Sequence, residues 1–155
     1  MNGMIVKSNP IRIVGLKTDL KESIEDNLEI IPAFWHKTLG SKQYEQICDL
    51  ENQSPQGVLG VSVYIDPQHI YYYIAAATNQ PVPNQMVEFE IPAATWCIVK
   101  SDGRRSSFQN MFKYFLLEWL PTSGYDYAKL PDIEVYPVDS LNHLSKEVWF
   151  GIKKD

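Results

Sequence analysis

Along the first hundred residues, apolar side chains alternate with polar ones in short runs separated by Gly, Pro, Asn and Asp. This period of two is typical of β-strands, and the interruptions are typical of turns. A polar turn at 66–69 separates two of the runs, which predicts a hairpin, and prolines bend two others. We predict strands at residues 4–15, 58–65, 70–78, 86–91 and 94–100.

Three other stretches carry apolar residues at the spacing of an amphipathic helix. The first begins close to Pro32, which the first turn of a helix tolerates, and the polar residues 18–27 before it predict a loop. The third has a wide apolar stripe that includes Phe112 and Trp119, and Pro121 follows its end. We predict helices at residues 30–39, at 41–50 and from 106 or 107 to 119.

The last third of the chain contains two further apolar runs, at 132–136 and 147–153, which predict two strands. Glu134 lies inside the first run, where a carboxylate costs free energy unless another group pairs with it. Alternation places Glu134 and Tyr136 on one face of the strand and the aliphatic residues on the other. This acid beside an aromatic ring is the first place to look for a ligand.

The predicted elements follow the order strand, helix, strand, strand twice along the chain. We therefore predict one α+β domain over 1–155, made of duplicated β-α-β-β units at 1–79 and 85–155 with a linker at 80–84. The sheet is expected to be antiparallel, with helices packed on one side. Aligning the two units predicts one continuous aromatic face around Glu134. The first unit is expected to supply Tyr64, Tyr71 and Tyr73, and the second unit Tyr136 and Trp149.

The composition of the chain disfavours several classes of function. The chain has 155 residues, a formal net charge of −5, 45% hydrophobic residues and 12% aromatic residues, which indicates a globular domain rich in rings. The acidic balance disfavours a nucleic-acid partner, and Lys100, Arg104 and Arg105 are typical of a solvated turn. With two cysteines and no signal or membrane segment, we predict a cytoplasmic protein with no membrane partner, in which Cys97 is an inert core thiol. The histidines lack ligand-like spacing, so we expect no metal and no cofactor.

The role of Glu134 itself stays open at this stage. Together with aromatic rings it could bind a hydrophobic cation, and a buried carboxyl group could also serve as a general acid or base. It could equally point to water from an edge strand, or pair with Lys146. These alternatives differ in what lies around the carboxylate.

Each tryptophan has an alternative in simple core packing. For Trp119, on the helix stripe, core packing is the favoured interpretation, and it also applies to Trp96. Trp149 is expected to contact a ligand, because alternation is expected to place it on the face of Glu134, only one strand away. Trp35 neighbours Phe34, and a helix can bury only one of the two fully, so the other is expected at a pocket rim.

Three motifs in the second half of the chain carry a family resemblance. The run EWLPTSGY at 118–125, IEVY at 133–136 and EVWFGIK at 147–153 resemble the closing signature of the GyrI-like effector-binding domains. The stretch IPAATW at 91–96 is similar to the central strand of that family. The chain departs from the closing motif at Gly151, where the family often has Pro.

This resemblance implies a small-molecule-binding protein. GyrI-like domains consist of two repeated units around an aromatic-lined pocket with a glutamate, which falls here on Glu134, with Tyr136, Trp149 and Phe112 as walls. The chain is then expected to be a stand-alone module that binds hydrophobic, cationic or planar xenobiotics. Other members hydrolyse cyclopropane-bearing genotoxins or modulate DNA gyrase, so a hydrolase with Glu134 as acid or base, and a modulator of gyrase or of a regulator, are the alternatives. The residues expected to bind the ligand are Glu134, Tyr136, Trp149, Phe112, Tyr64, Tyr71, Tyr73, Trp96, Trp119 and Trp35.

Overall fold

A computed structural model describes residues 1–101, 107–137 and 146–155 of the chain. Arg104 and Arg105 of the predicted basic turn lie outside the described residues, as does His143. Everything that follows concerns the described part of the chain.

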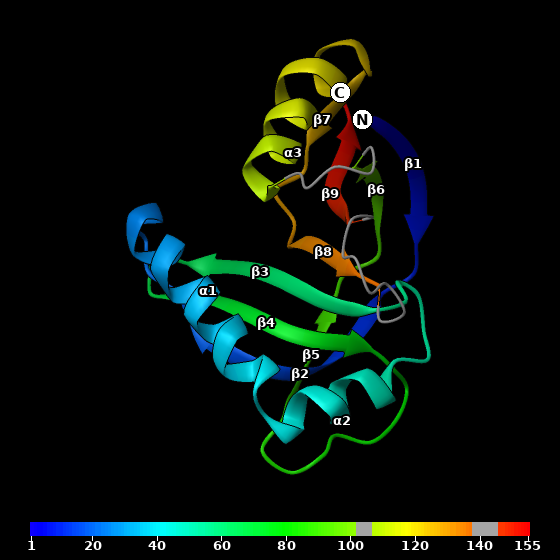
Figure 1. The fold of residues 1–155 in the computed structure, drawn as a ribbon. Helices are drawn as coiled ribbons and strands as arrows, with labels where there is room; N and C mark the ends of the chain where they lie inside the picture. Colours follow the sequence, from blue (N-terminus) through cyan, green and yellow to red (C-terminus); the bar gives the residue numbers. More distant parts are fainter. Residues whose placement is uncertain (102–106, 138–145) are drawn as a thin grey trace.

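The described strands form a single antiparallel sheet of nine strands, which confirms the predicted α+β class (Figure 1). The order across the sheet is β1-β6-β9-β8-β3-β4-β2-β5, and the short strand β7, absent from the sequence prediction, pairs with β9. The strands are β1 (Asn2–Ser8), β2 (Ile11–Asp19), β3 (Val58–Asp66), β4 (His69–Ala77), β5 (Val87–Ile91), β6 (Ala94–Lys100), β7 (Tyr125–Tyr127), β8 (Asp132–Tyr136) and β9 (Glu147–Lys154).

The two halves of the sheet have equivalent strand orders on either side of the central pair, β8 and β3. From β3 it continues through β4 and β2 to β5, and from β8 it continues through β9 and β6 to β1. The edge strand beside β2 therefore comes from the second half of the chain, and the edge strand beside β6 comes from the first half. The duplication of 1–79 and 85–155 around a linker at 80–84 stays a prediction.

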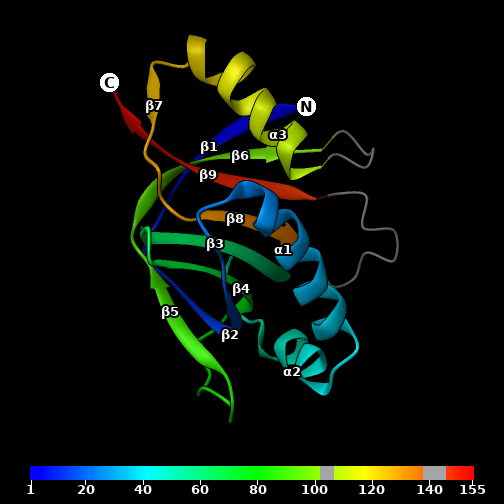
Figure 2. The ribbon, with the colours of Figure 1, turned by 90° about the vertical axis from the view of Figure 1, so that its left-hand side faces the viewer.

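The helices lie on one side of this sheet, as predicted (Figure 2). They are α1 (Ile24–Leu39), α2 (Lys42–Leu50) and α3 (Phe108–Tyr114), and α3 continues as a π-turn (Phe115–Trp119) and a short 3-10 turn (Leu120–Thr122). The predicted third helix is thus confirmed, with a change of helical pitch in its second half.

The loop predicted at 18–27 is wrong. Strand β2 runs to Asp19, and α1 already begins at Ile24. The reason is a helix start that the polar composition concealed, because the Ser23 hydroxyl caps the helix by accepting a hydrogen bond from the Asp26 amide. Pro32 consequently lies inside the helix instead of opening it.

Both faces of the sheet carry a core. On the helix side one buried cluster lies under α1 and α2 and another under α3, and β8 passes between these two covered regions (Figure 1). On the opposite side the sheet curls around a third cluster, which joins residues of β2 and β5 to residues of β6 and β9. The large members of this third cluster include Trp96, Trp149 and Tyr73.

Candidate functional site

Glu134 lies on a central strand and faces the helices. It pairs with Gly60 of β3 on one side and with Val148 of β9 on the other, so it is not an edge residue. Directly opposed residues in an antiparallel ladder project to the same face of the sheet. Val148 belongs to the cluster under α3, which identifies the face of Glu134 as the helix-covered one.

The predicted continuous aromatic face is wrong. Trp149 pairs with Ile133, the neighbour of Glu134, and so projects to the side without helices. Tyr73 lies opposite Val61, which in turn lies opposite Ile133, and this places Tyr73 and the alternating Tyr71 on that side as well. The strand pairing assumed within each hairpin was one residue out of register, and such a shift moves every side chain of a strand to the other face.

The displaced aromatic residues have a packing role. Trp96 is fully buried and its ring centroid lies 6.0 Å from that of Trp149, which is only 5% exposed. Trp119, also expected at the site, stacks on Phe115 and on Tyr125 at 5.8 and 6.3 Å between ring centroids. Core packing therefore accounts for these tryptophans.

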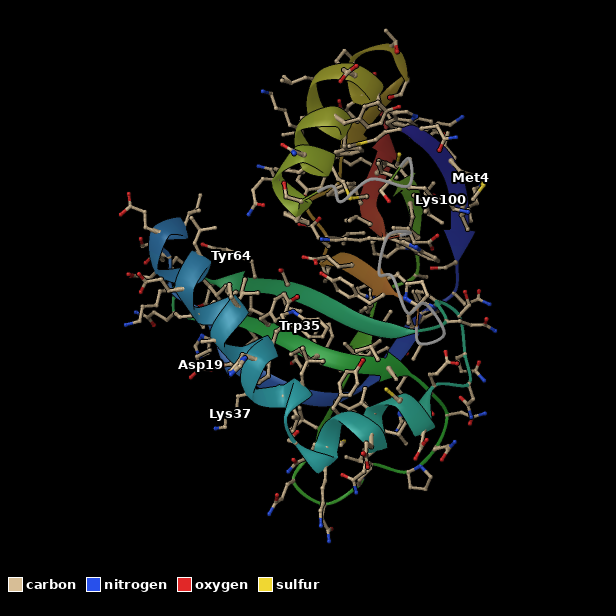
Figure 3. All side chains as sticks on the ribbon, in the orientation of Figure 1. Met4, Asp19, Trp35, Lys37, Tyr64 and Lys100 are labelled. Atoms are coloured by element: carbon tan, nitrogen blue, oxygen red, sulfur yellow. The ribbon has the colours of Figure 1, made fainter. Side chains whose placement is uncertain are left out.

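Two of the predicted residues do meet beside Glu134. The hydroxyl of Tyr136 donates a hydrogen bond to Oε2 of Glu134. Burial, together with the charge of Glu134, raises the pKa of Tyr136, which keeps this hydroxyl protonated as a donor. The ring of Trp35, from α1, meets the ring of Tyr136 edge to face at 5.0 Å between centroids. Figure 3 shows Trp35 on the sheet side of α1.

A further aromatic residue, Tyr72, was missed from the sequence. Its hydroxyl accepts a hydrogen bond of 2.9 Å from Nε1 of Trp35. Burial first, and the charge of Glu134 second, raise the pKa of Tyr72 well above its ordinary value. The available signal was alternation within the run 71–73, which sends the middle tyrosine to the face opposite its neighbours.

Gly60 makes room for this arrangement. A Cβ atom at Gly60 would lie 2.1 Å from the Tyr72 hydroxyl and 3.4 Å from the ring of Trp35. The absence of a side chain at the residue opposite Glu134 thus lets the Tyr72 hydroxyl and the Trp35 ring lie directly on the strand. The site is an acid enclosed by three rings, those of Trp35, Tyr72 and Tyr136.

One cation also reaches the acid. Nζ of Lys146 lies 3.2 Å from Oε2 of Glu134 and 5.3 Å from the centre of the Tyr136 ring. The two side chains are only 14% and 13% exposed, so the ion pair is largely screened from water. Pairing with Lys146, one of the alternatives left open by the sequence, is therefore what the structure shows for Glu134.

Two hollows open at the ends of the strand face that carries Glu134. One of about 280 Å³ is lined by Trp35, Leu39, Tyr44 and Tyr136. The other, of about 270 Å³, has Asp132 and the exposed Tyr64 in its lining. Residues 132, 134 and 136 of β8 alternate onto one face, so this face runs from one hollow to the other with Glu134 between them.

Asp132 is a second acid that the sequence analysis did not single out. Burial, together with the charge of Glu134, raises its pKa to about 7, although a hydrogen bond of 2.9 Å from the Tyr127 hydroxyl acts in the opposite direction. The ring of Tyr127 contacts Phe112 of α3 at 5.8 Å between centroids. Phe112 thus reaches this end of the strand face through Tyr127, without a ring contact to the aromatic residues around Glu134.

The site offers no donor set for a metal. Among the described residues, no group of three or more His, Cys, Asp or Glu side chains is placed to hold a metal ion. None of the helices within 1–101, 107–137 and 146–155 is long and apolar enough to cross a membrane. The residues around Glu134 offer charge, hydrogen bonds and aromatic contact to a ligand.

Comparison with known proteins places this arrangement in context. The family model of Cass2, described as integron-associated effector binding protein, matches residues 4–152. No curated protein sequence matches the chain. Among solved structures, SAV2435 bound to tetraphenylphosphonium superposes with a TM-score of 0.82 at 14% identity, covering 99% of this chain and 94% of that one.

Two further structures share the fold. A putative bacterial transcription regulation protein from Staphylococcus aureus MU50 gives a TM-score of 0.81 at 15% identity, covering 99% of both chains. An integron cassette protein from the mobile metagenome of Vibrio cholerae gives 0.64 at 14% identity, covering 97% of this chain and 95% of that one. At such identities the likeness establishes the fold alone.

Proposed function

Because the chain belongs to the Cass2 family of integron-associated effector-binding proteins, with the GyrI-like fold that its closing motifs predicted, we propose that it binds hydrophobic cations around Glu134. An effector-binding domain follows from the family itself. The ligand class and the residues that contact the ligand are the proposal. One observation carries it, namely a largely buried carboxylate enclosed by Trp35, Tyr72 and Tyr136.

The chemistry of the enclosure favours a cation with an apolar body. A carboxylate supplies charge, and aromatic faces attract cations through their quadrupoles, with about 2 kcal/mol per contact when water is excluded. The same rings offer apolar area that a small hydrated ion cannot use. A lipophilic cation such as a quaternary phosphonium therefore gains from both interactions.

The hollow beside Tyr136 is the expected entry to the site. Its volume is about 280 Å³, and its lining of Trp35, Leu39, Tyr44 and Tyr136 is almost entirely apolar. An apolar cavity of about 150 Å³ is enough to hold a benzene ring. The hollow thus has room for an aryl group of a ligand whose charged centre faces Glu134. The tetraphenylphosphonium bound to SAV2435, a protein of the same fold, supports this ligand class.

Fluorescence titration tests the proposal. Tetraphenylphosphonium or a rhodamine dye is added to the wild-type protein while the tryptophan emission is followed, since Trp35 lies at the site. We expect saturable quenching, and about tenfold weaker binding in Glu134→Gln, which corresponds to about 1.4 kcal/mol of lost affinity. Glu118→Gln, at an exposed position, removes the same charge elsewhere and is expected to leave binding unchanged. Equal affinity of the wild-type protein and Glu134→Gln for the dye would show that Glu134 does not contribute to binding.

The other roles implied by the family resemblance stay predictions. A hydrolase that opens strained rings would use Glu134 with the Tyr136 hydroxyl, and incubation with a cyclopropane-bearing alkylator followed by product analysis tests for it. Modulation of gyrase or of a regulator, the absence of a direct nucleic-acid partner, and the cytoplasmic location likewise stay predictions.

A further inference from the structure

The position proposed for a bound cation is already taken by a cation of the protein. The ammonium of Lys146 lies 3.2 Å from the Glu134 carboxylate and 5.3 Å from the centre of the Tyr136 ring. These are the two interactions, charge and aromatic face, that a cationic ligand would use at the site. Lys146 thus makes the contacts of a ligand while remaining part of the chain.

Lys146 is held in this place by its backbone. Its carbonyl accepts a hydrogen bond of 3.1 Å from the Ser101 amide, which fixes the residue directly before β9. It precedes Val148, the cross-strand partner of Glu134, by two positions, so alternation sends its side chain to the face of Glu134. A lysine side chain that is only 14% exposed also differs from the usual solvated surface lysine.

We propose that Lys146 determines the ligand specificity of the site by acting as a tethered competitor for Glu134. The inference rests on the proposed binding of hydrophobic cations and adds that every such ligand must displace the Lys146 ammonium into water. A small hydrophilic amine gains too little from the rings to do so. A large cation with delocalised charge gains apolar contact that the lysine head does not have, so the site selects this class.

The charge of Lys146 changes how strongly the site favours a cationic ligand. With Lys146 in place, the pair of Glu134 and Lys146 is neutral, so the acid adds less to the preference for a cation over an anion of equal shape than it would alone. Without the lysine, the enclosed carboxylate keeps a hydrogen bond from Tyr136 but has lost the counter-ion seen at 3.2 Å. An unpaired and largely buried charge favours any cation that can reach it.

Tetraphenylphosphonium and tetraphenylborate are the probes for this test, because they have the same shape and opposite charges. Calorimetric titration compares the wild-type protein with Lys146→Met. We expect the variant to bind the phosphonium about tenfold more tightly and the borate more weakly. Lys100→Met is the matched control, since it removes the same charge from an exposed pair with Glu147, and it is expected to behave as wild type.

A double-mutant cycle separates competition from other effects. In the Glu134→Gln background, Lys146→Met is expected to give a much smaller gain for the phosphonium than in the wild-type background, because the carboxylate that pairs with the Lys146 ammonium is absent. An unchanged or weaker phosphonium affinity in Lys146→Met, with the fold intact by circular dichroism, would overturn the inference.

The outcomes also separate this inference from the binding proposal. If the wild-type protein fails to bind the phosphonium and Lys146→Met binds it, the proposed function of the natural chain is wrong and the competition is right. If the wild type binds and the variant gains nothing, the binding proposal stands and the competition is refuted. If neither protein binds, both are refuted.

Discussion

A single methyl group added at Gly60 is expected to disturb both the stability and the site. The Cβ atom of Gly60→Ala would lie 2.1 Å from the Tyr72 hydroxyl and 3.0 Å from the carbon that carries it. Tyr72 is only 1% exposed, and Trp35 donates a hydrogen bond to its hydroxyl. The ring therefore has little freedom to withdraw. Gly60 does not have a positive φ angle, so the cost of the substitution is steric and not conformational.

The expected cost can be estimated from the contacts. Overpacking a core usually costs about 1–3 kcal/mol, and loss of the hydrogen bond between Trp35 and Tyr72 adds about 0.5–1.5 kcal/mol. The lower entropy of alanine in the unfolded chain returns about 0.4–1 kcal/mol. The free energy of unfolding should fall by about 2 kcal/mol, which is about 4–8 °C in Tm for a domain of this size.

Urea and thermal unfolding followed by circular dichroism measure this loss, and dye titration measures the accompanying loss of affinity. Gly40→Ala is the matched control, because its Cβ atom would have no heavy atom closer than 3.8 Å. In the Tyr72→Phe background the hydroxyl is absent, so the added cost of Gly60→Ala should be smaller than in wild type. A Gly60→Ala protein as stable as Gly40→Ala would refute the packing described around Glu134.

Three further results follow from the structure. The pKa of Asp132 is raised from 3.8 to about 7 in the folded protein. Between these two values the folded protein keeps the proton on Asp132, whereas the unfolded chain loses it. The free energy of unfolding should therefore fall as the pH rises from about 4 to about 7, by up to roughly 4 kcal/mol. Asp132→Asn should flatten this slope in urea unfolding at several pH values, and an equally steep slope in the variant would contradict the assignment. Trp149→Phe should destabilise the protein by about 1–3 kcal/mol without changing its affinity for the dye. Trp35→Phe should weaken dye binding several-fold, because Trp35, unlike Trp149, lies on the side of the sheet that Glu134 faces. A loss of affinity in Trp149→Phe would show that Trp149 is assigned to the wrong face. Cys97 is fully buried, and burial raises its pKa to about 12, whereas Cys48 is partly exposed. An aromatic disulfide reagent should therefore label only Cys48 until the protein unfolds. Labelling of both thiols in the native protein would contradict the fold.

The class of the fold and the unusual place of Glu134 in an apolar strand were predictable because they depend on local patterns. The alternation in the strands and the stripe of the third helix are short-range signals, and the nine-stranded sheet and its helices confirm most of them. The prediction of one strand at 4–15 is wrong, because β1 ends at Ser8 and pairs with β6, whereas β2 begins at Ile11 and pairs with β4 and β5. Glu134 stood out because a carboxylate inside an apolar strand calls for a partner. The structure supplies that partner in Tyr136 and Lys146.

The pairing between strands was not predictable in the same way. Period-two patterns fix which residues of one strand share a face, but they do not fix which residue of the next strand lies opposite. The shift by one residue moved Trp149 and Tyr73 to the wrong side, and it hid Tyr72. The start of α1 was missed for a related reason, because the cap at Ser23 has the polar composition of a loop.

A structure of the protein in complex with tetraphenylphosphonium would show whether a hydrophobic cation binds at Glu134. We expect the phosphonium to lie on the helix-covered face, with its charged centre facing Glu134 and an aryl ring within about 6 Å of Tyr136 or Trp35. The Lys146 ammonium should have moved away from the carboxylate. A ligand seated anywhere else on the protein, or one bound beside an intact pair of Glu134 and Lys146, would contradict this expectation.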